Sequence, residues 1–231
     1  MSRQTTLPPR ITIVTGHYGS GKTNVAINLA MQMQAQGLKV ALVDLDIVNP
    51  YFRSADFTRL AYKHGIELVA MDYANSNVDL PSMPSDIYAV FNRRDRHVIL
   101  DVGGDDSGAV ALGQYAKLIE EENDYRMLYV INRYRYWTQG ADDTVELMHS
   151  IEQASRLKVT ELVNNSHLAK LTTAEDIEAS FAYADEVAKQ TGLPLTMTTI
   201  REDICRESFG DLRSAVPVQI YVRTPWDDPV E

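Results

Sequence analysis

Residues 16–23 read Gly16-His17-Tyr18-Gly19-Ser20-Gly21-Lys22-Thr23, which is the pattern G-x-x-x-x-G-K-T. An apolar run at 11–14 precedes this stretch and predicts a buried strand, while apolar residues at helical spacing follow it over 26–33. Glycines let a backbone curl until several N–H groups face one anion, and the helix adds the positive end of its dipole. The stretch therefore predicts a phosphate-binding loop (P-loop), in which Lys22 reaches the outer phosphates and Thr23 places its hydroxyl on a magnesium ion. A plain glycine-rich turn is the alternative.

The composition indicates an ordinary globular protein. The chain has 231 residues, of which 45% are hydrophobic and 23% charged, so we expect one domain over residues 1–231. The net charge of −10 argues against a surface that holds nucleic acid through phosphate contacts, and we expect no nucleic-acid partner. Short arginine clusters at 93–96 and 133–135 are interpreted as solvated loop ends, with a local basic patch as the alternative.

Cysteine and histidine usage excludes several kinds of site. The single cysteine, Cys205, leaves no intramolecular disulfide and no C-x-x-C motif, although it could bridge two chains. The five histidines lack the spacing that seats zinc, so we expect neither a zinc nor an iron–sulfur site. No apolar run is long enough to span a membrane, and residues 1–10 lack the apolar stretch of a secretion signal. We therefore expect a cytoplasmic protein without a stable membrane anchor.

Apolar runs alternate with helical stretches along the whole chain. Runs such as Val98-Ile99-Leu100 are apolar on both faces, as strands inside a parallel sheet must be when helices cover each side. The fold class is therefore predicted as α/β, a three-layer αβα sandwich with a mostly parallel, twisted sheet of seven or eight strands. Strands are expected over 11–15, 39–44, 66–71, 98–101, 127–132, 159–164 and 195–200, with an edge strand at 218–222; helices are expected over 22–36, 52–64, 85–91, 108–121, 140–156, 174–191 and briefly from 203.

Acidic residues follow two of the predicted strands. Asp101 closes one strand and begins Asp101-Val102-Gly103-Gly104, where a carboxylate can hold the water shell of magnesium and a glycine N–H can approach the terminal phosphate. Asp44 and Asp46 close another strand and, being two residues apart, point to the same side. A magnesium nucleotide would relieve the repulsion between them. The alternative for Asp101 is a strand-end aspartate that only caps the next turn. The alternative for Asp44 and Asp46 is a pair of exposed loop carboxylates.

In this order and spacing the motifs resemble the MinD/ParA group of P-loop ATPases, of the SIMIBI class. The group also includes nitrogenase iron protein and the Mrp-type and CooC-type metal-assembly ATPases. The resemblance rests on 16–23, on Val43-Asp44-Leu45-Asp46 and on 101–104. Two weaker matches follow: Leu162-Val163-Asn164-Asn165 is similar to the family's V-N-R segment, and Ile200-Arg201-Glu202-Asp203 to its I-P-x-D segment.

The resemblance implies ATP and Mg²⁺ as cofactors and a role for each motif residue. Lys22 and the backbone of the P-loop bind phosphates, and Thr23 ligates magnesium with Asp44 and Asp101 in support. Asp46 positions the attacking water, so Lys22 and Asp46 are the expected catalytic pair. Gly104 senses the γ-phosphate, and Asn164 contacts the base.

The P-loop departs from the family at two positions. Members of the ParA and MinD type carry a lysine at the second loop position, which reaches a partner's phosphates across a nucleotide-sandwich dimer. Here that position is His17, which is shorter and only partly charged near neutral pH, and Tyr18 would crowd a facing subunit. Whether ATP drives the pairing of two chains into a homodimer therefore stays an open question. His17 either satisfies the loop sterically, donates to a phosphate or serves a substrate.

Three functions fit these motifs. The first is a MinD/ParA-like ATPase that hydrolyses MgATP to switch its interaction with an unknown protein partner, for example in enzyme or metallocentre assembly. The second is an ATP-dependent small-molecule kinase or ligase, and the third an adaptor that holds ATP without hydrolysing it. Adenine is favoured because the guanine signatures N-K-x-D and T-K-x-D do not occur. The aromatic residues within 133–137 stack on a base, bind a partner or pack beneath the next helix, and the irregular stretch 72–84 is either a partner contact or a surface excursion.

Overall fold

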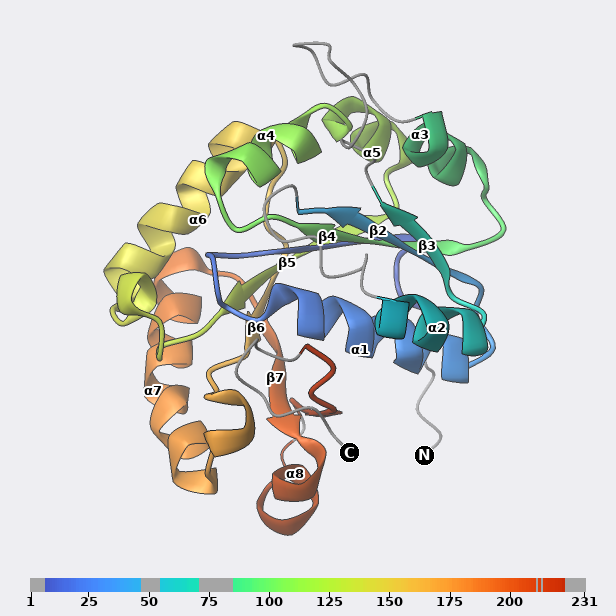
Figure 1. Cartoon of the computed structure of the whole chain (residues 1–231). Coiled ribbons are helices and arrows are strands. Elements are labelled where there is room, and N and C mark those ends of the chain that lie inside the picture. The colour runs from blue at the N-terminus through green and yellow to red at the C-terminus, as the bar shows by residue number, and fades with distance from the viewer. Residues whose placement is uncertain (1–6, 47–54, 71–84, 211, 213, 223–231) are drawn as a thin grey trace.

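The structure, a computed structural model, describes residues 7–46, 55–70, 85–210, 212 and 214–222. In Figure 1 the sheet crosses the middle of the molecule, with helices above and below it. The strands are β1 (Ile11–Thr15), β2 (Val40–Leu45), β3 (Glu67–Ala70), β4 (His97–Val102), β5 (Tyr125–Ile131), β6 (Glu161–Asn164), β7 (Leu195–Arg201) and β8 (Ala215–Val218). The helices are α1 (Lys22–Ala35), α2 (Ala55–Lys63), α3 (Ser85–Asn92), α4 (Asp106–Gly113), α5 (Ala116–Glu122), α6 (Ala141–Ser155), α7 (Ala174–Thr191) and α8 (Glu202–Ser208), with 3₁₀ turns η2 (Tyr136–Thr138) and η3 (Ala169–Leu171).

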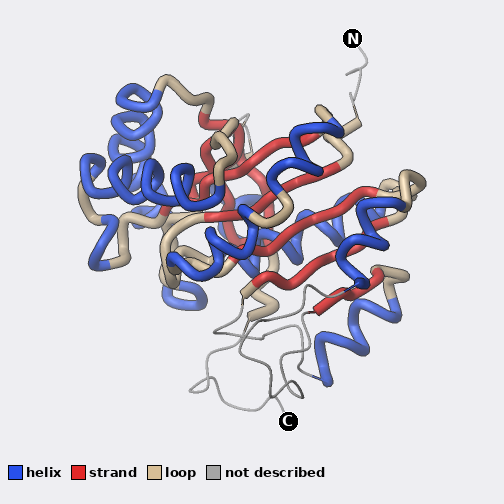
Figure 2. The backbone as a smooth tube through the Cα atoms, turned by 90° about the horizontal axis from the view of Figure 1, so that it is seen from above, coloured by secondary structure: helices blue, strands red, loops and turns tan. Residues whose placement is uncertain are grey.

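The eight strands form one sheet in the order β3-β2-β4-β1-β5-β6-β7-β8, and every neighbouring pair is parallel. Seen from above in Figure 2, the strands run side by side with helices on both faces. The predicted αβα sandwich is therefore confirmed. Among the described ranges, no helix is both long and apolar enough to cross a membrane.

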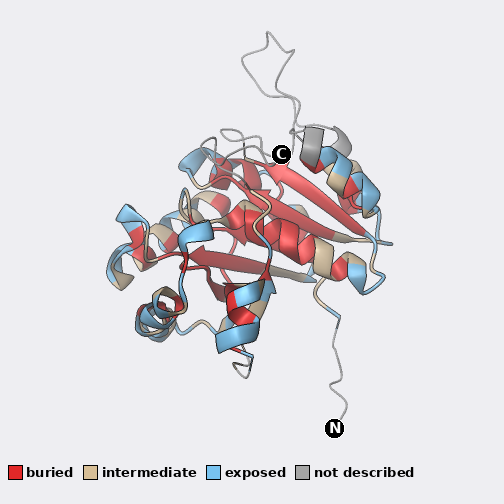
Figure 3. Ribbon diagram, turned by 60° about the horizontal axis from the view of Figure 1, so that its bottom comes forward, coloured by how far each residue is buried: buried red, intermediate tan, exposed pale blue. Residues whose placement is uncertain are grey.

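Each face of the sheet has its own hydrophobic core. Ile11 and Ile13 of β1 join a cluster with residues of α3, α4, α5, α6 and α7, whereas Val14 joins a second cluster with α1 and α2. This alternation follows from the pleat of a strand, which sends successive side chains to opposite faces. The strands and the inner side of α1 are accordingly buried in Figure 3.

Two predicted elements differ from the structure. The helix expected over 108–121 is two helices, α4 and α5, separated by Gln114 and Tyr115. The ring of Tyr115 is buried against Phe91, with the ring centroids 5.8 Å apart, and the break in the helix brings it there. The expected helix start was also wrong, because Asp105 caps the helix by accepting from the Gly108 N–H (3.0 Å).

The edge strand expected at 218–222 lies instead at Ala215–Val218, and 219–222 takes a different path. The backbone N–H groups of Gln219 and Tyr221 donate to the side-chain oxygens of Asn28 (2.9 Å) and Asn24 (2.8 Å) on α1. Two buried asparagine amides therefore satisfy this backbone in place of a neighbouring strand.

Strand order brings the acidic strand ends together. β4 lies between β1 and β2, and Asp44 of β2 stands directly opposite Asp101 of β4 in the register. Asp101 is also in register with Val14, one residue before the end of β1. The P-loop and both acidic motifs therefore share one edge of the sheet, where parallel α/β proteins bind ligands.

Candidate nucleotide-binding site

The loop between β1 and α1 is curled by three glycines with positive φ. Gly16, Gly19 and Gly21 have φ values of 145°, 74° and 90°, a region that residues with a Cβ rarely adopt. The Ser20 N–H donates to the His17 carbonyl (3.1 Å), which closes a turn inside the loop. The predicted strand, loop and helix follow one another as the motif requires.

Lys22 lies back along this loop, and its side chain is almost wholly buried. Its Nζ donates to the His17 carbonyl oxygen at 3.2 Å. Burial lowers the pKa of Lys22, and the opposite charges of Asp101, Asp46 and Asp105 act against that shift. The ammonium group thus faces three carboxylates from the ends of β2 and β4 and the start of α4.

The segment after β4 packs directly on the P-loop at Gly104. A Cβ on this glycine would lie 2.5 Å from the Tyr18 backbone nitrogen and 2.6 Å from Lys22 Nζ. Such distances are far inside van der Waals contact, so only glycine fits between the two segments. A ligand that displaces Lys22 or the loop would therefore also displace the backbone after β4.

We expect Gly104→Ala to disturb both the fold and nucleotide binding. The added methyl group forces apart two backbone segments, a kind of overpacking that costs about 1–3 kcal/mol. Affinity for a fluorescent nucleotide should fall about tenfold or more, since 1.4 kcal/mol corresponds to a factor of ten. Urea denaturation and fluorescence titration measure the two effects. Gly210→Ala is the control, because its Cβ would meet nothing nearer than 4.0 Å; equal behaviour of the two variants would contradict this packing argument.

Thr23 and Asp101 form the part of the site that fits a magnesium ion. Thr23 Oγ1 donates to Asp101 Oδ2 at 2.7 Å. Asp101 Oδ1 is buried and accepts no hydrogen bond from the residues that the structure describes. Burial raises the pKa of Asp101 to about 7, although Lys22 and the Thr23 hydroxyl act to lower it. A buried carboxylate oxygen without a donor, beside a hydroxyl, fits a hard cation or its water shell.

Asp44 and Asp46 lie at the same edge of the sheet. Asp44 is buried, and its Oδ1 accepts from the backbone N–H of Asp46 at 2.8 Å. Asp46 follows the last residue of β2, is half-buried, and acts electrostatically on both Lys22 and Asp101. Its Cα lies 3.5 Å from the position that a Cβ on Gly103 would take. The two acidic motifs are thus in contact through their backbones.

Of the two asparagines at the end of β6, it is Asn165 that touches the P-loop. Asn165 Nδ2 donates to the Ser20 carbonyl oxygen at 2.6 Å, and its Oδ1 accepts from the Thr199 hydroxyl. Asn164, the predicted base contact, is fully buried, with its amide donating to Ser180 Oγ (2.8 Å) and accepting from the Ser166 N–H (3.1 Å). Its contact with a base stays a prediction.

Comparison with known proteins identifies the family. The profile of the CobQ/CobB/MinD/ParA nucleotide-binding domain matches residues 11–190. The chain belongs to this family. The resemblance to the MinD/ParA group is thereby confirmed. The comparison with curated proteins gave no match.

The fold of this MinD/ParA-family chain is shared with solved structures of FtsY. It is similar to the cell division protein FtsY of Thermotoga maritima (20% identity, TM-score 0.57), covering 84% of this chain and 62% of that one. It is also similar to chloroplast FtsY of Physcomitrella patens (18% identity, TM-score 0.57), covering 84% of this chain and 59% of that one. A third similar structure is the signal recognition particle receptor FtsY of Elizabethkingia anophelis in complex with GDP (20% identity, TM-score 0.53), with 86% of this chain and 60% of that one covered. The chain thus spans about three fifths of the length of these proteins.

His17 brings little positive charge to the loop of this MinD/ParA-family protein. Burial and the neighbouring Lys22 both lower the pKa of the His17 imidazole from its ordinary value of 6.5. The ring is therefore mostly neutral at pH 7. Tyr18, the next residue of the loop, is 60% exposed.

His167 is a site residue that no motif pointed to. Its Nδ1 accepts from the Ala169 N–H (3.1 Å), so the proton of the neutral ring sits on Nε2. Nε2 is buried, donates to no acceptor among the described residues, and lies 3.8 Å from the Cβ position of Gly21. Burial, helped by Arg135 and Arg201, lowers the pKa of His167 to about 4. A neutral N–H donor therefore faces the P-loop.

His167 should make the protein sensitive to acid. Its pKa is lower in the folded chain (about 4) than the ordinary 6.5, so the unfolded chain binds the proton more tightly, and stability present above pH 6.5 is lost as pH falls toward 4. The loss is on the order of 3 kcal/mol at most. Melting curves from pH 7 to pH 4 should fall more steeply for the wild type than for His167→Gln. His149→Gln, on the exposed side of α6, should follow the wild type; equal slopes for all three proteins would refute the prediction.

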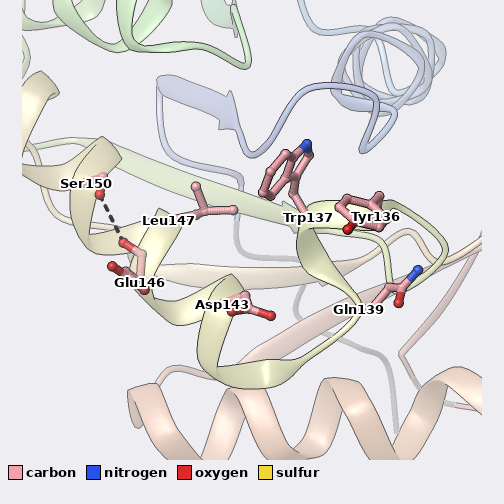
Figure 4. A pocket seen from close by; sticks show the side chains of 7 residues that line it. All are labelled: Tyr136, Trp137, Gln139, Asp143, Glu146, Leu147 and Ser150. Carbon is pink, nitrogen blue, oxygen red and sulfur yellow. Dashed lines mark hydrogen bonds between the residues drawn. The ribbon is translucent and has the colours of Figure 1, made fainter.

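The aromatic residues after β5 divide between packing and exposure. The Tyr134 hydroxyl donates to the Asp176 carbonyl (2.6 Å), so Tyr134 packs against α7. Tyr136 and Trp137 are instead 76% and 65% exposed and meet edge to face, with centroids 5.2 Å apart. Figure 4 shows them beside the first turns of α6, at a groove of about 530 Å³. Gln139, Asp143, Glu146, Leu147 and Ser150 complete its lining.

Proposed function

We propose that this protein binds MgATP at the P-loop and hydrolyses it, so that the nucleotide state switches its interaction with a protein partner. One observation carries the proposal: the Lys22 ammonium and the buried Asp101 carboxylate lie together at the mouth of a glycine-curled loop, and Asp101 Oδ1 accepts no hydrogen bond from any described residue. Such a group of residues supplies what phosphoryl transfer needs, which is positioning and the neutralisation of charge.

Each residue takes one part of this chemistry. Lys22 and the loop N–H groups bind phosphate oxygens, and Thr23 with Asp101 and Asp44 would hold magnesium. When bound, the ion neutralises charge on the phosphates. Asp46, at the half-exposed rim of the site, orients the attacking water. Gly104, packed on Lys22 and Tyr18, transmits the loss of the γ-phosphate to the segment after β4.

The segment 135–139 supports the part of the proposal that concerns a partner. Large exposed aromatic rings such as Tyr136 and Trp137 are enriched in protein interfaces. They follow Arg135, which lies against Gly19 of the P-loop. A conformational change in the loop could therefore be transmitted to the groove through Arg135 alone. Assembly or activation of an enzyme or a metallocentre is the process that we propose for such a switch, by the resemblance to its relatives.

A phosphate-release assay with MgATP or MgGTP as the only substrate tests the proposal. A switch releases phosphate slowly without any metabolite. ADP formation is measured alongside, because a kinase transfers the γ-phosphate to its acceptor and releases none. ADP formation that requires an added metabolite would indicate a kinase or ligase, and tight binding without ADP formation would indicate an adaptor. GTP is included because one related structure, FtsY of Elizabethkingia anophelis, holds GDP; we expect ATP to be the better substrate.

Hydrogen exchange tests the switch itself without knowledge of the partner. Amides of 135–139 and of 103–108 should exchange more slowly with MgATP bound than with MgADP, because the γ-phosphate orders both segments. The distant segment 93–97 serves as the internal reference. Identical exchange at all three segments in the two states would refute nucleotide switching while leaving hydrolysis intact.

A further inference from the structure

We infer that Arg135 binds the phosphates of the nucleotide in cis, and that it supplies the positive charge that His17 does not bring to the loop. This inference rests on the proposed function, since it concerns the same triphosphate. No sequence motif marks Arg135; its place in the fold does.

The first step is the position of the side chain. The three heavy atoms nearest to a Cβ built on Gly19 are Nε, Cδ and Cζ of Arg135, at 3.4, 3.5 and 3.6 Å. The guanidinium therefore lies along the middle of the P-loop, at the residue whose backbone faces bound phosphate in loops of this kind. It also acts electrostatically on His167, which lies beside Gly21 at the end of the same loop.

The second step is how firmly the backbone of Arg135 is held. The Arg135 N–H donates to the Asn132 carbonyl (3.2 Å), and the Thr138 N–H donates to the Arg135 carbonyl (3.0 Å). Asn132 is buried, and its amide joins the turn to the His167 carbonyl (3.2 Å). The two preceding residues point elsewhere, because Arg133 donates to the Ala179 carbonyl and Tyr134 to Asp176. Only Arg135 of this turn is directed across the P-loop.

The third step is charge. Lys22 has three carboxylates near its ammonium group, and Arg201 makes an ion pair with Asp203 (2.6 Å). Within the described ranges the side chain of Arg135 makes no hydrogen bond or ion pair, and it is exposed. An arginine that pairs with no carboxylate of the described residues thus lies at Gly19 of the loop, in which burial and Lys22 lower the pKa of His17. A guanidinium in this position suits phosphate oxygens, which it can grip with two N–H groups.

Calorimetric titration with MgATP compares the wild type with Arg135→Ala, Arg135→Lys and the control Arg94→Ala, an exposed arginine between α3 and β4. We expect Arg135→Ala to weaken binding about ten- to one-hundredfold, the range for a lost charge-assisted hydrogen bond. Arg135→Lys should recover part of the loss, and Arg94→Ala should bind as the wild type. The weakening should be the same at protein concentrations tenfold apart, because the contact lies within one chain.

Melting of the nucleotide-free proteins separates binding from packing. Arg135 is exposed, so Arg135→Ala should have the same melting temperature as the wild type. Unchanged affinity for MgATP overturns the inference and leaves the proposed function standing. A loss of affinity that comes with a lower melting temperature and is not restored by lysine assigns Arg135 to loop packing, and also overturns it. Failure of the wild type to bind any nucleotide overturns both the inference and the proposed function.

Discussion

Replacing Asp46 by asparagine is expected to lower the rate of MgATP hydrolysis about 10²- to 10⁴-fold, the usual contribution of a carboxylate that positions and activates a nucleophile. Asparagine keeps the size of the side chain and removes its charge. The Asp46 backbone N–H that donates to Asp44 is untouched, so the edge of the sheet should keep its shape. Steady-state phosphate release gives the rate.

Nucleotide affinity should survive the same change. Asp46 is half-buried at the rim, and the groups that bind phosphate are the loop backbone and Lys22. Affinity for MgATP is expected to stay equal or to rise a few-fold, because a negative charge near the phosphates is removed. Asp185→Asn, an exposed carboxylate on α7, serves as the control and should leave both quantities unchanged. Full turnover by Asp46→Asn would remove Asp46 from the catalytic machinery.

Lys22→Ala should abolish tight nucleotide binding, with a loss of affinity on the order of 100-fold or more. The ammonium group is desolvated, and charge-assisted hydrogen bonds in such surroundings contribute about 1.5–3 kcal/mol each. The variant should still fold: without the lysine charge beside it, Asp101 loses a group that lowers its pKa and takes up a proton more readily.

Lys39→Ala is the matched control for Lys22→Ala. Lys39 is an exposed lysine that pairs with Asp95 at 2.9 Å, away from the P-loop. Equilibrium titration with a fluorescent ATP analogue measures affinity, and circular dichroism checks the fold. Tight binding by Lys22→Ala would contradict the phosphate-binding role of this loop.

Local patterns were enough to predict most of the fold. The apolar runs that become β1 and β7 begin at the residues where the strands begin. Helix α7 begins at a capping box formed by Thr173 and Asp176. The predictions were wrong where tertiary contacts decide: the ring of Tyr115 is buried against Phe91 of α3, and the backbone of 219–222 binds asparagine side chains of α1. Neither contact leaves a periodic signal in the sequence.

The site shows the same division. The P-loop and the acidic motifs are contiguous stretches whose residue types indicate phosphate and metal binding, so they could be predicted from the sequence. Arg135 reaches the P-loop from the segment after β5, and Asn165 and His167 reach it from the segment after β6. Strand order decides this, because β5 lies next to β1 and β6 lies next to β5. Arg135 stands in a short cluster with Arg133, and nothing in that spacing marks it as a phosphate ligand. Its proximity to Gly19 exists only in three dimensions.

Isothermal titration of the wild-type protein with MgATP, and separately with MgGTP, tests the central claim most directly. We predict saturable binding of one MgATP per chain, with MgGTP binding more weakly because the guanine signatures are missing. Absence of heat and of saturation with both nucleotides, in protein shown to be folded, would contradict the claim that this edge of the sheet holds a triphosphate.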